Sequence, residues 1–393
     1  MACSPGTSPR DSSAVRPCRV CAAPSEVFYV REGVPVLQNI LFDTEREARM
    51  SPVGRLELSA CSRCGFVSNE AFDGVLASYD ARYENDQMRS PTFADHARRM
   101  ARRVVDAMGP DGLLEIGCGQ GGFITLMAGM IGRDAGPIVG FDPAARCDAV
   151  SGIPIVQRMF DAEAARDLAF SPGVVVVRHV IEHIPDPVPF LERVRAAITP
   201  GSRIFVETPC VSWILRHDAV HDLFHEHCSY FSAVSLTAAL HASGFGDVRV
   251  DHVFSGDYLW AEAVAGRASA ERTGDGSLLA SARTFAARAD EVGARWRREL
   301  ASLPPARALW GAGAKGVTFA TTIDPDRARV ELLVDRNPQK QGRYVPVSGH
   351  PVLSPAAAAA AGLGAVVVMN AAYAGEVDAE LLALGVAPVR LVV

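Results

Sequence analysis

The spacing of apolar positions predicts a buried parallel sheet in the middle of the chain. Strand-like apolar runs alternate with helical patterns there, at 113–116, 123–130, 137–142, 174–177, 187–198 and 203–206. Continuous runs such as the four valines at 174–177 suit strands that helices cover on both faces. We therefore predict a doubly wound α/β domain in this region.

Further apolar patterns flank this domain. Helical spacing over 93–108 predicts a helix that leads into the first strand. A helix is predicted at 236–241, and strands at 248–254 and 258–264 are expected to pair antiparallel and close the sheet. A long apolar stripe over 268–300 predicts a helix, and such a stripe is more typical of core packing than of a cofactor site.

A second strand–glycine–helix unit follows the boundary marked by Pro304 and Pro305. Residues 308–316 read Ala-Leu-Trp-Gly-Ala-Gly-Ala-Lys-Gly, and the strand-like run 330–335 again ends in an aspartate. The alanine run at 356–361 predicts a helix. The pattern indicates a C-terminal Rossmann-like unit that extends to Val393.

The first glycine loop carries the strongest ligand signal. Glycines at 117, 119 and 121 follow a strand and open a helix, so the backbone can turn sharply and approach a ligand. Glu115 suits a cationic ligand better than a diphosphate, and Asp142 ends the next strand, 23 residues after Gly119, where it can bind ribose hydroxyls. The loop resembles the E-x-G-x-G loop of class I S-adenosylmethionine (SAM) methyltransferases, although a dinucleotide fingerprint looks similar and a tight turn without a ligand is the plain alternative. The candidate cofactor contacts are Glu115, Gly117, Cys118, Gly119, Asp142 and Pro143.

Two C-x-x-C motifs, separated by 39 residues, predict a metal site. Their cysteines are Cys18, Cys21, Cys61 and Cys64. Each motif can form a tight turn that points two thiolates at one ion, and two such turns complete a tetrahedral zinc site. The insert predicts strands at 34–41 and 56–59. A redox dithiol needs only one pair, so we expect structural zinc that serves folding.

Histidines follow one strand of the central sheet. His179 and His183 come directly after the run at 174–177. Because the carboxyl ends of strands line the ligand crevice in doubly wound sheets, these side chains are expected to face the methyl donor. The alternative is that they are hydrogen-bonded support residues.

Four histidines lie within the eleven residues 217–227. Histidine titrates near neutrality and can act as a general base, and a neighbouring carboxylate such as Glu226 can fix its tautomer. His227 with Glu226 is therefore a candidate base. A metal held by His221, His225 and His227 is the alternative.

Positive charge accompanies the second glycine loop. Lys315 stands at a helix N-terminus, which attracts anions, and Arg336, Lys340 and Arg343 follow the next strand. This pattern indicates either a solvated basic face or a cradle for a diphosphate group of the substrate.

Composition narrows the class of protein. The 393 residues are enough for two or three domains, and the net charge of −6 argues against a dominant nucleic-acid surface. Without about 18 uninterrupted apolar residues, no membrane span is expected. Residues 1–16 are expected to form a disordered tail rather than a signal peptide. Nine cysteines, an odd number, suit a reducing cytoplasm better than a disulfide framework.

The order of these parts resembles one family. The paired C-x-x-C module, the E-x-G-x-G domain, the H-x-x-x-H at 179–183, the Glu-His pair at 226–227 and the terminal glycine unit are similar to the zinc-containing three-domain C-methyltransferases of bacterial deoxysugar and natural-product pathways. The likeness extends from Cys18 to about Leu384. It implies SAM-dependent methylation of a ketosugar carbon, with a nucleotide-linked substrate between the central and C-terminal domains.

The resemblance also implies residue roles. His227 of the Glu226–His227 pair corresponds to the histidine that removes the proton next to the keto group. His183 corresponds to a histidine close to the sugar, and His179 falls where the sugar enzymes often have asparagine. Phe224 departs from the tyrosine of some sugar members. His225 or Tyr230 could replace that hydroxyl, and Tyr230 joins Lys315 and Arg336 as a candidate substrate contact.

These expectations give one organisation of the chain. We expect a zinc-binding module at 17–85, a class I methyltransferase domain at 86–267, a helical connector at 268–303 and a Rossmann-like substrate-nucleotide domain at 304–393. The acceptor is expected to be a small molecule, with no nucleic acid or membrane partner, and the protein a monomer or homodimer. The alternatives are O- or N-methylation of another natural-product scaffold, a non-catalytic binding module, a nicotinamide oxidoreductase and a zinc hydrolase.

Overall fold

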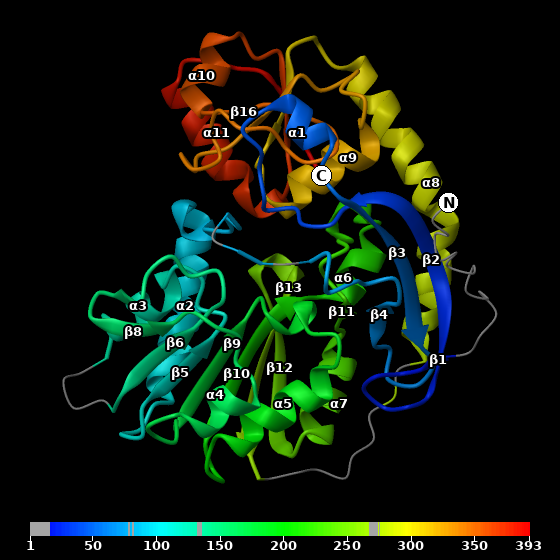
Figure 1. The fold of residues 1–393 in the computed structure, drawn as a ribbon. Helices are drawn as coiled ribbons and strands as arrows, with labels where there is room; N and C mark the ends of the chain where they lie inside the picture. Colours follow the sequence, from blue (N-terminus) through cyan, green and yellow to red (C-terminus); the bar gives the residue numbers. More distant parts are fainter. Residues whose placement is uncertain (1–15, 78, 81, 132–135, 267–273, 275) are drawn as a thin grey trace, which may run out of the picture.

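Three sheets organise the protein (Figure 1). The computed structural model describes residues 16–77, 79–80, 82–131, 136–266, 274 and 276–393. The expected disordered tail, apart from Arg16, lies outside the described residues, as do residues 268–273 and 275 of the connector expected at 268–303. In the described part of the chain, no helix has the length and apolar character needed to cross a membrane.

The N-terminal sheet is antiparallel, and its last strand comes from the histidine-rich segment far along the chain. Its order is β1 (Arg16–Pro17), β2 (Pro24–Pro35), β3 (Val53–Cys61), β4 (Val67–Asn69) and β11 (Ser229–Tyr230), with the short helix α1 (Glu45–Arg49) between β2 and β3. Ser229 pairs with Ser68 and Tyr230 with Val67. The N-terminal module is therefore joined by strand pairing to the residues that follow His227.

The prediction of a strand at 34–41 is wrong in position. The strand in this region, β2, lies earlier in the chain and ends at Pro35, and residues 36–41 are irregular. The β-branched and aromatic residues before Pro35 favour the strand, whereas proline has no N–H to continue the ladder.

The central sheet has the doubly wound form that the apolar pattern predicted. Its order is β12-β13-β10-β9-β5-β6-β8-β7, in which β10, β9, β5, β6 and β8 run parallel. The strands are β5 (Leu113–Ile116), β6 (Ile138–Phe141), β7 (Ala149–Val150), β8 (Ile153–Val156), β9 (Val174–Arg178), β10 (Arg203–Pro209), β12 (Phe245–Val253) and β13 (Tyr258–Ala265). The expected closing pair is confirmed, because β13 is antiparallel to both β10 and β12.

Helices cover both faces of this sheet, so its valine strand is buried. They are α2 (Pro91–Asp106), α3 (Gly122–Ala128), α4 (Ala162–Arg166), α5 (Pro187–Ala196) and α7 (Ala233–Ala242). The buried residues of α6 (Val211–Arg216) belong instead to the apolar cluster of the N-terminal sheet. Each of the residues 174–177 is at most 1% exposed. This agrees with the reading of a continuous apolar run as a strand that is covered on two sides.

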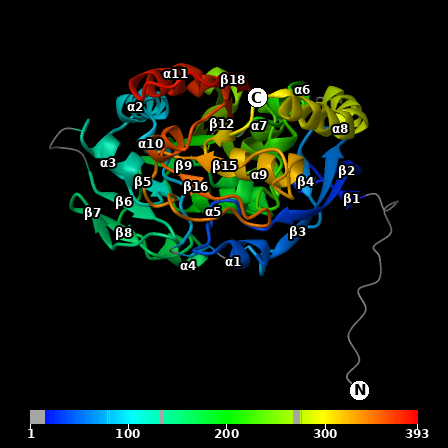
Figure 2. The ribbon, with the colours of Figure 1, turned by 90° about the horizontal axis from the view of Figure 1, so that it is seen from above.

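The C-terminal sheet is fully parallel. Its order is β16 (Val352–Leu353), β15 (Leu332–Val334), β14 (Arg307–Trp310), β17 (Ala365–Val368) and β18 (Val389–Val392), with helices α9 (Ala314–Ile323), α10 (Pro355–Ala360) and α11 (Ala374–Ala383). Figure 2 shows α11 beside α2, and Glu376 of α11 accepts a hydrogen bond from Ser90 Oγ at 2.6 Å. The C-terminal unit therefore sits directly on the central domain.

The long helix α8 (Ser277–Ser302) ties the N-terminal and C-terminal sheets together (Figure 1). Its buried stripe includes Phe285, Trp296 and Leu300, which belong to one apolar cluster with Leu56 of β3 and Phe319 of α9. The stripe is thus core packing, as expected. Burying aromatic and leucine side chains of this size contributes roughly 1.5–3 kcal/mol each.

Candidate active site

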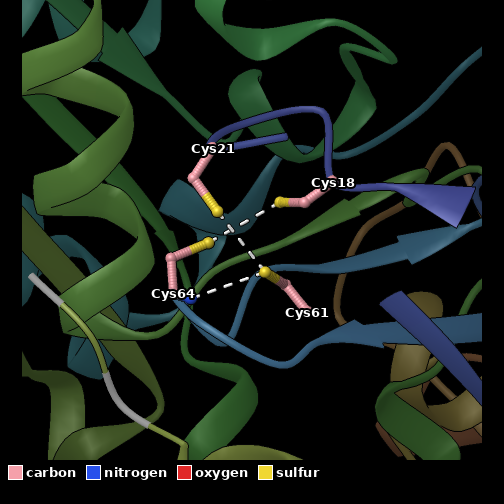
Figure 3. A group of neighbouring side chains, drawn as sticks. All are labelled: Cys18, Cys21, Cys61 and Cys64. Atoms are coloured by element: carbon pink, nitrogen blue, oxygen red, sulfur yellow. Dashed lines mark hydrogen bonds between the residues drawn. The ribbon is translucent and has the colours of Figure 1, made fainter. Parts of the chain in front are cut away.

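The four cysteines of the paired motifs converge at the base of the N-terminal sheet. Figure 3 shows their sulfur atoms pointing toward one another. Cys18 Sγ lies 3.6 Å from Cys64 Sγ, and Cys21 Sγ lies 3.5 Å from Cys61 Sγ. All four are free thiols, and their sulfurs lie within 4.8 Å of one another.

This cluster fits a tetrahedral metal ion. Four thiolates about 2.3 Å from zinc have sulfur–sulfur edges of about 3.8 Å, close to the spacing here. The backbone N–H groups of Arg63 and Cys64 donate to Cys61 Sγ at 3.3 and 3.4 Å, and that of Val20 donates to Cys18 Sγ at 3.4 Å. Such bonds favour the charged thiolate that a metal requires.

The first glycine loop is built to hold a ligand. Gly117, Gly119 and Gly121 all have positive φ (77°, 55° and 81°), which side chains with a Cβ rarely adopt. A Cβ at Gly119 would meet no described atom within 4 Å, so open space adjoins the loop. Asp142 accepts the Gly119 N–H at 2.8 Å and the Ala144 N–H at 2.7 Å, which fixes the carboxylate beside the loop.

The other expected cofactor contacts surround this loop. Cys118 is buried beneath it and Pro143 is exposed beside Asp142. Glu115 is 2% exposed, and its Oε2 has no hydrogen-bond partner among the described residues. Burial raises the pKa of Glu115 to about 8, against the opposing effect of the Arg178 charge. A buried carboxyl with an unused oxygen fits the cationic ligand that the sequence predicted.

Replacing Glu115 by glutamine is expected to stabilise the protein at pH 8 but hardly at pH 5. The folded protein keeps a proton on Glu115 up to about pH 8, whereas the unfolded chain loses it near the ordinary value of 4.5. The free energy of unfolding of the wild type therefore falls as pH rises from about 4.5 to about 8. Glutamine cannot ionise and so avoids this fall, which amounts to up to about 4 kcal/mol when each pKa unit of difference counts about 1.4 kcal/mol. Thermal melts without SAM at both pH values measure the effect. The exposed Glu291→Gln serves as control, and an equal change in Tm at both pH values would contradict the assignment.

A cavity of about 240 Å³ lies between the central and C-terminal domains. Its wall includes His179, His183, Glu226 and His227 from the central domain, which are all four of the predicted catalytic residues. The opposite wall is the second glycine loop, at 311–316, with the segment that follows β15. The structure thus brings together three motifs that are widely separated in the sequence.

His183 is the most tightly oriented of these histidines. It ends the 3₁₀ turn η2 (Ile181–His183), and its Nδ1 lies 2.7 Å from Tyr79 Oη and 3.2 Å from the backbone oxygen of Glu226. Because a carbonyl can only accept, Nδ1 carries the proton, which leaves Nε2 as the acceptor in the neutral ring. Tyr79 in turn donates to the Glu226 carboxylate at 3.2 Å.

Glu226 therefore orients His183, whereas the sequence suggested that it orients His227. Its carboxylate also accepts the Tyr83 hydroxyl at 2.9 Å and the Gln38 N–H at 3.1 Å, and lies 3.7 Å from His183 Nδ1. The chain here is irregular, so Glu226 and His227 point into different surroundings.

His227 is buried and electrically neutral. Burial, then the nearby charges of His183 and His179, hold the pKa of its imidazole well below the usual range. Its ring stands edge-on to His183 and Phe224, with centroids 4.7 and 4.6 Å apart, and its Nδ1 has no hydrogen-bond partner within the described chain. A proton acceptor that stays neutral at physiological pH is thus available in the cavity, although burial makes it a weaker base than the sequence implied.

His179 stands between two carboxylates at the end of β9. Its Nδ1 is 3.6 Å from Glu182 and its Nε2 is 3.8 Å from Glu207. Its φ of 53° is unusual for a residue with a side chain, and the Glu207 carbonyl accepts its N–H at 2.8 Å. Backbone held in this region is often found where a side chain must be aimed at a ligand.

The three histidines of the alternative metal site, His221, His225 and His227, lie in different surroundings. His221 packs against Phe319, and His225 Nδ1 lies 2.9 Å from the Arg55 carbonyl on β3. Among the residues described, the second group able to hold a metal is instead Glu182, His183 and His227, with ligand atoms within 4.8 Å of one another.

The predicted substrate contacts differ from expectation. Lys315 lies in the cavity wall but is paired with Asp222 at 2.9 Å and Asp257 at 3.1 Å, two carboxylates of the central domain. Burial opposes the charge of Lys315, yet the two aspartates outweigh it and raise its pKa. Arg336 is paired with Glu376 at 2.5 Å and Glu380 at 3.1 Å. Neither cation is free for a diphosphate in this arrangement.

Tyr230 lies outside the cavity wall. Its hydroxyl accepts the Phe224 N–H and donates to the Phe224 carbonyl, both at 2.9 Å, and the ring is 2% exposed. It therefore closes the 224–230 segment rather than facing the cavity. The sequence analysis missed Tyr79 and Tyr83, and it missed Asp222 and Asp257, which both pair with Lys315. The only signal for the two tyrosines was the mixture of aromatic and polar residues over 79–85.

Two family models match this chain in succession. One describes a methyltransferase domain and matches residues 91–250. The other describes a C-methyltransferase C-terminal domain and matches residues 250–393. Together they span the central sheet, α8 and the C-terminal sheet.

Similar proteins are methyltransferases too. The C-methyltransferase NovU of Streptomyces niveus is 28% identical over 377 residues, which cover 88% of each chain. The ubiquinone biosynthesis O-methyltransferase of Aeromonas salmonicida is 32% identical over 100 residues, 24% of this chain and 42% of that protein. A solved SAM-dependent methyltransferase from Archaeoglobus fulgidus has a TM-score of 0.36 at 18% identity, and the match covers 46% of this chain and 96% of that one. Matched in succession by both models and similar to NovU over most of its length, the chain is a SAM-dependent methyltransferase related to the C-methyltransferase NovU.

Proposed function

We propose that this enzyme transfers a methyl group from SAM to a carbon next to a ketone on a nucleotide-activated deoxysugar, within a natural-product pathway. The observation that carries the proposal is the cavity in which His179, His183 and His227 face the second glycine loop. A proton-abstracting site at one end and a nucleotide-type loop at the other suit an acceptor with both parts. NovU is itself a C-methyltransferase.

The difficult step is to make carbon nucleophilic. SAM supplies an electrophilic methyl group whose sulfur leaves without assistance, so the protein must remove a proton from the acceptor. His227 takes this proton, because its imidazole is neutral and its Nδ1 is not engaged by the described protein. A positioned base contributes roughly 10²–10⁴-fold in rate.

The neighbouring groups stabilise the charges that develop. His179, between Glu182 and Glu207, donates a hydrogen bond to the enolate oxygen. The Glu226 carboxylate supports His183, both directly and through Tyr79, and the His183 ring lies against His227. Donors aimed at a developing oxyanion are commonly worth about 3–4 kcal/mol.

Two further features belong to the proposal. We place SAM between the 117–121 loop and Asp142, with Glu115 facing its positive charge, and zinc between the four cysteines. Free thiolates require a reducing compartment, so we infer a cytoplasmic enzyme.

Solvent exchange tests the reaction type. Incubated in D₂O without SAM, the enzyme is expected to exchange the hydrogen next to the ketone of its acceptor, because enolisation precedes methyl transfer. A panel of nucleotide ketosugars with labelled SAM identifies the acceptor first, and mass spectrometry of the recovered acceptor then measures deuterium. Methyl transfer without any exchange at carbon would overturn C-methylation.

O- or N-methylation is the second candidate. Phe224 lies against His227 in the cavity wall, so this position offers no hydroxyl to an enolate. A heteroatom acceptor needs less help with charge than carbon does. The same exchange experiment separates the two, since a heteroatom acceptor picks up no deuterium at carbon.

A further inference from the structure

The two glycine loops of this chain hold an aspartate in the same way. In the central domain, Asp142 Oδ2 accepts the Gly119 N–H at 2.8 Å, across 23 positions. In the C-terminal domain, Asp335 Oδ2 accepts the Ala312 N–H at 2.8 Å, also across 23 positions. Each carboxylate uses its other oxygen for the N–H two residues further on, at 2.7 Å in the first case and 2.8 Å in the second.

The backbone around the aspartates matches as well. The first loop glycine donates to the carbonyl just before the aspartate in both domains, Gly117 to Phe141 at 2.7 Å and Gly311 to Val334 at 2.8 Å. Both glycines have positive φ, 77° and 112°. The two loops therefore hold their aspartates by the same set of backbone contacts, with one difference in register. The N–H that reaches the aspartate belongs to the second residue after the first loop glycine in the central domain and to the first residue after it in the C-terminal domain.

The second aspartate faces open space that a ligand can enter. Asp335 lines the cavity and is partly exposed, and a Cβ at Gly313 of the same loop would meet no described atom within 4 Å. No ion pair holds Asp335 within the described chain. Of the cations in the same cavity wall, Lys315 and Arg336 are each paired with two carboxylates, and Lys340 donates to the Ala312 carbonyl at 3.0 Å.

The carboxylate has acceptor capacity left. An ionised carboxylate has about four lone-pair sites, and the two backbone N–H groups use two of them. In glycine-loop folds, an acid at the end of the second strand binds the hydroxyls of a ribose. Asp142 has this position for the nucleoside of SAM.

We propose that Asp335 binds the pentose hydroxyls of the acceptor's nucleoside, as Asp142 binds those of the donor. This inference rests on the proposed nucleotide-linked acceptor and deepens it: one chain uses the same clamp twice, for two nucleosides. Asp335, rather than Lys315 or Arg336, is then the residue of the C-terminal domain that recognises the nucleotide, through hydrogen bonds from its pentose hydroxyls.

Calorimetry on the full-length protein with S-adenosylhomocysteine bound tests the clamp. ADP, CDP, GDP, UDP and dTDP are titrated, and the tightest binder is taken forward. Asp335→Asn is expected to weaken it roughly 10–100-fold, the range for a hydrogen bond to a charged group, and to leave S-adenosylhomocysteine affinity unchanged. Asp142→Asn, the matched control, is expected to do the reverse.

A change of ligand separates binding from loop support. In the wild type, the 2′,3′-dideoxy form of the tightest diphosphate is expected to bind at least tenfold more weakly than the parent, and in Asp335→Asn this difference disappears. A dideoxy form that binds the wild type equally well, an Asp335→Asn variant that still discriminates, or no binding of any diphosphate would each overturn the clamp. Since the wild-type comparison needs no variant, a failure of Asp335→Asn to fold leaves the test intact. Methyl transfer and deuterium exchange are separate readouts, so the reaction can stand while the clamp falls.

Discussion

Replacing His227 by alanine is expected to lower turnover roughly 10²–10⁴-fold while SAM still binds at near wild-type affinity. The side chain lines the cavity, is 7% exposed and is held neutral by burial and by the charges around it. Its removal takes away the proposed proton acceptor without changing the 117–121 loop or Asp142. Single-turnover kinetics with labelled SAM, together with calorimetric titration of SAM, measure the two quantities separately.

A distant histidine provides the control for this variant. His252 lies exposed on β12, so His252→Ala should leave both turnover and SAM affinity unchanged. Deuterium exchange should be lost with methyl transfer in His227→Ala, because both need the same proton removal.

The outcome also distinguishes His227 from its neighbour. His183 has the better hydrogen-bonded support, through Tyr79 and Glu226, and its Nε2 is an acceptor in the neutral ring. Retention of exchange in His227→Ala and its loss in His183→Ala would move the base to His183. The electrostatic reason would be that Glu226, 3.7 Å from His183, stabilises the imidazolium there rather than on His227.

The sequence predicted those elements and site residues that depend on a local pattern, such as an apolar run or the spacing of two cysteines. The valine run at 174–177 gave a central strand because burial on both faces requires continuous apolar residues. His179 and His183 lie together in the cavity wall, because the carboxyl ends of parallel strands meet at one edge, whereas their expected orientation toward the methyl donor stays a prediction. The cysteines were identified by spacing alone, and the structure brings their sulfurs together.

The missed features depend on contacts between distant segments. No periodicity indicates that Tyr79 reaches His183, 104 positions away, or that Lys315 meets Asp222 and Asp257. The direction of Glu226 was inferred from its neighbour in sequence, yet the backbone at 224–228 is irregular, so adjacent side chains face different elements. Short strands such as β7 and β11 have two residues each, too few for an apolar pattern.

Replacing Cys61 by serine is expected to remove the metal and to lower both the melting temperature and turnover strongly. Cys61 Sγ faces Cys21 Sγ at 3.5 Å and accepts two backbone N–H groups, so its loss opens one side of the four-thiolate cluster. Structural zinc in small sites contributes about 10–16 kcal/mol of folding free energy in peptides, so even a fraction of that exceeds ordinary mutational effects. Metal analysis should fall from one zinc per chain to none, with thermal melts following the loss.

The loss of turnover follows from the strand order. β3 ends at Cys61 and pairs with β4, and β4 holds β11, whose Ser229 lies two residues after His227. When the metal is lost, the end of this sheet is released and His227 is no longer held against His183. The exposed Cys147→Ser variant is the control, and it should keep its zinc, its melting temperature and its activity. A Cys61→Ser protein that retains one zinc per chain would show that Cys61 is not needed to hold the metal. A variant that loses zinc yet melts and turns over like the wild type would show that the metal supports neither the fold nor the active site through β11.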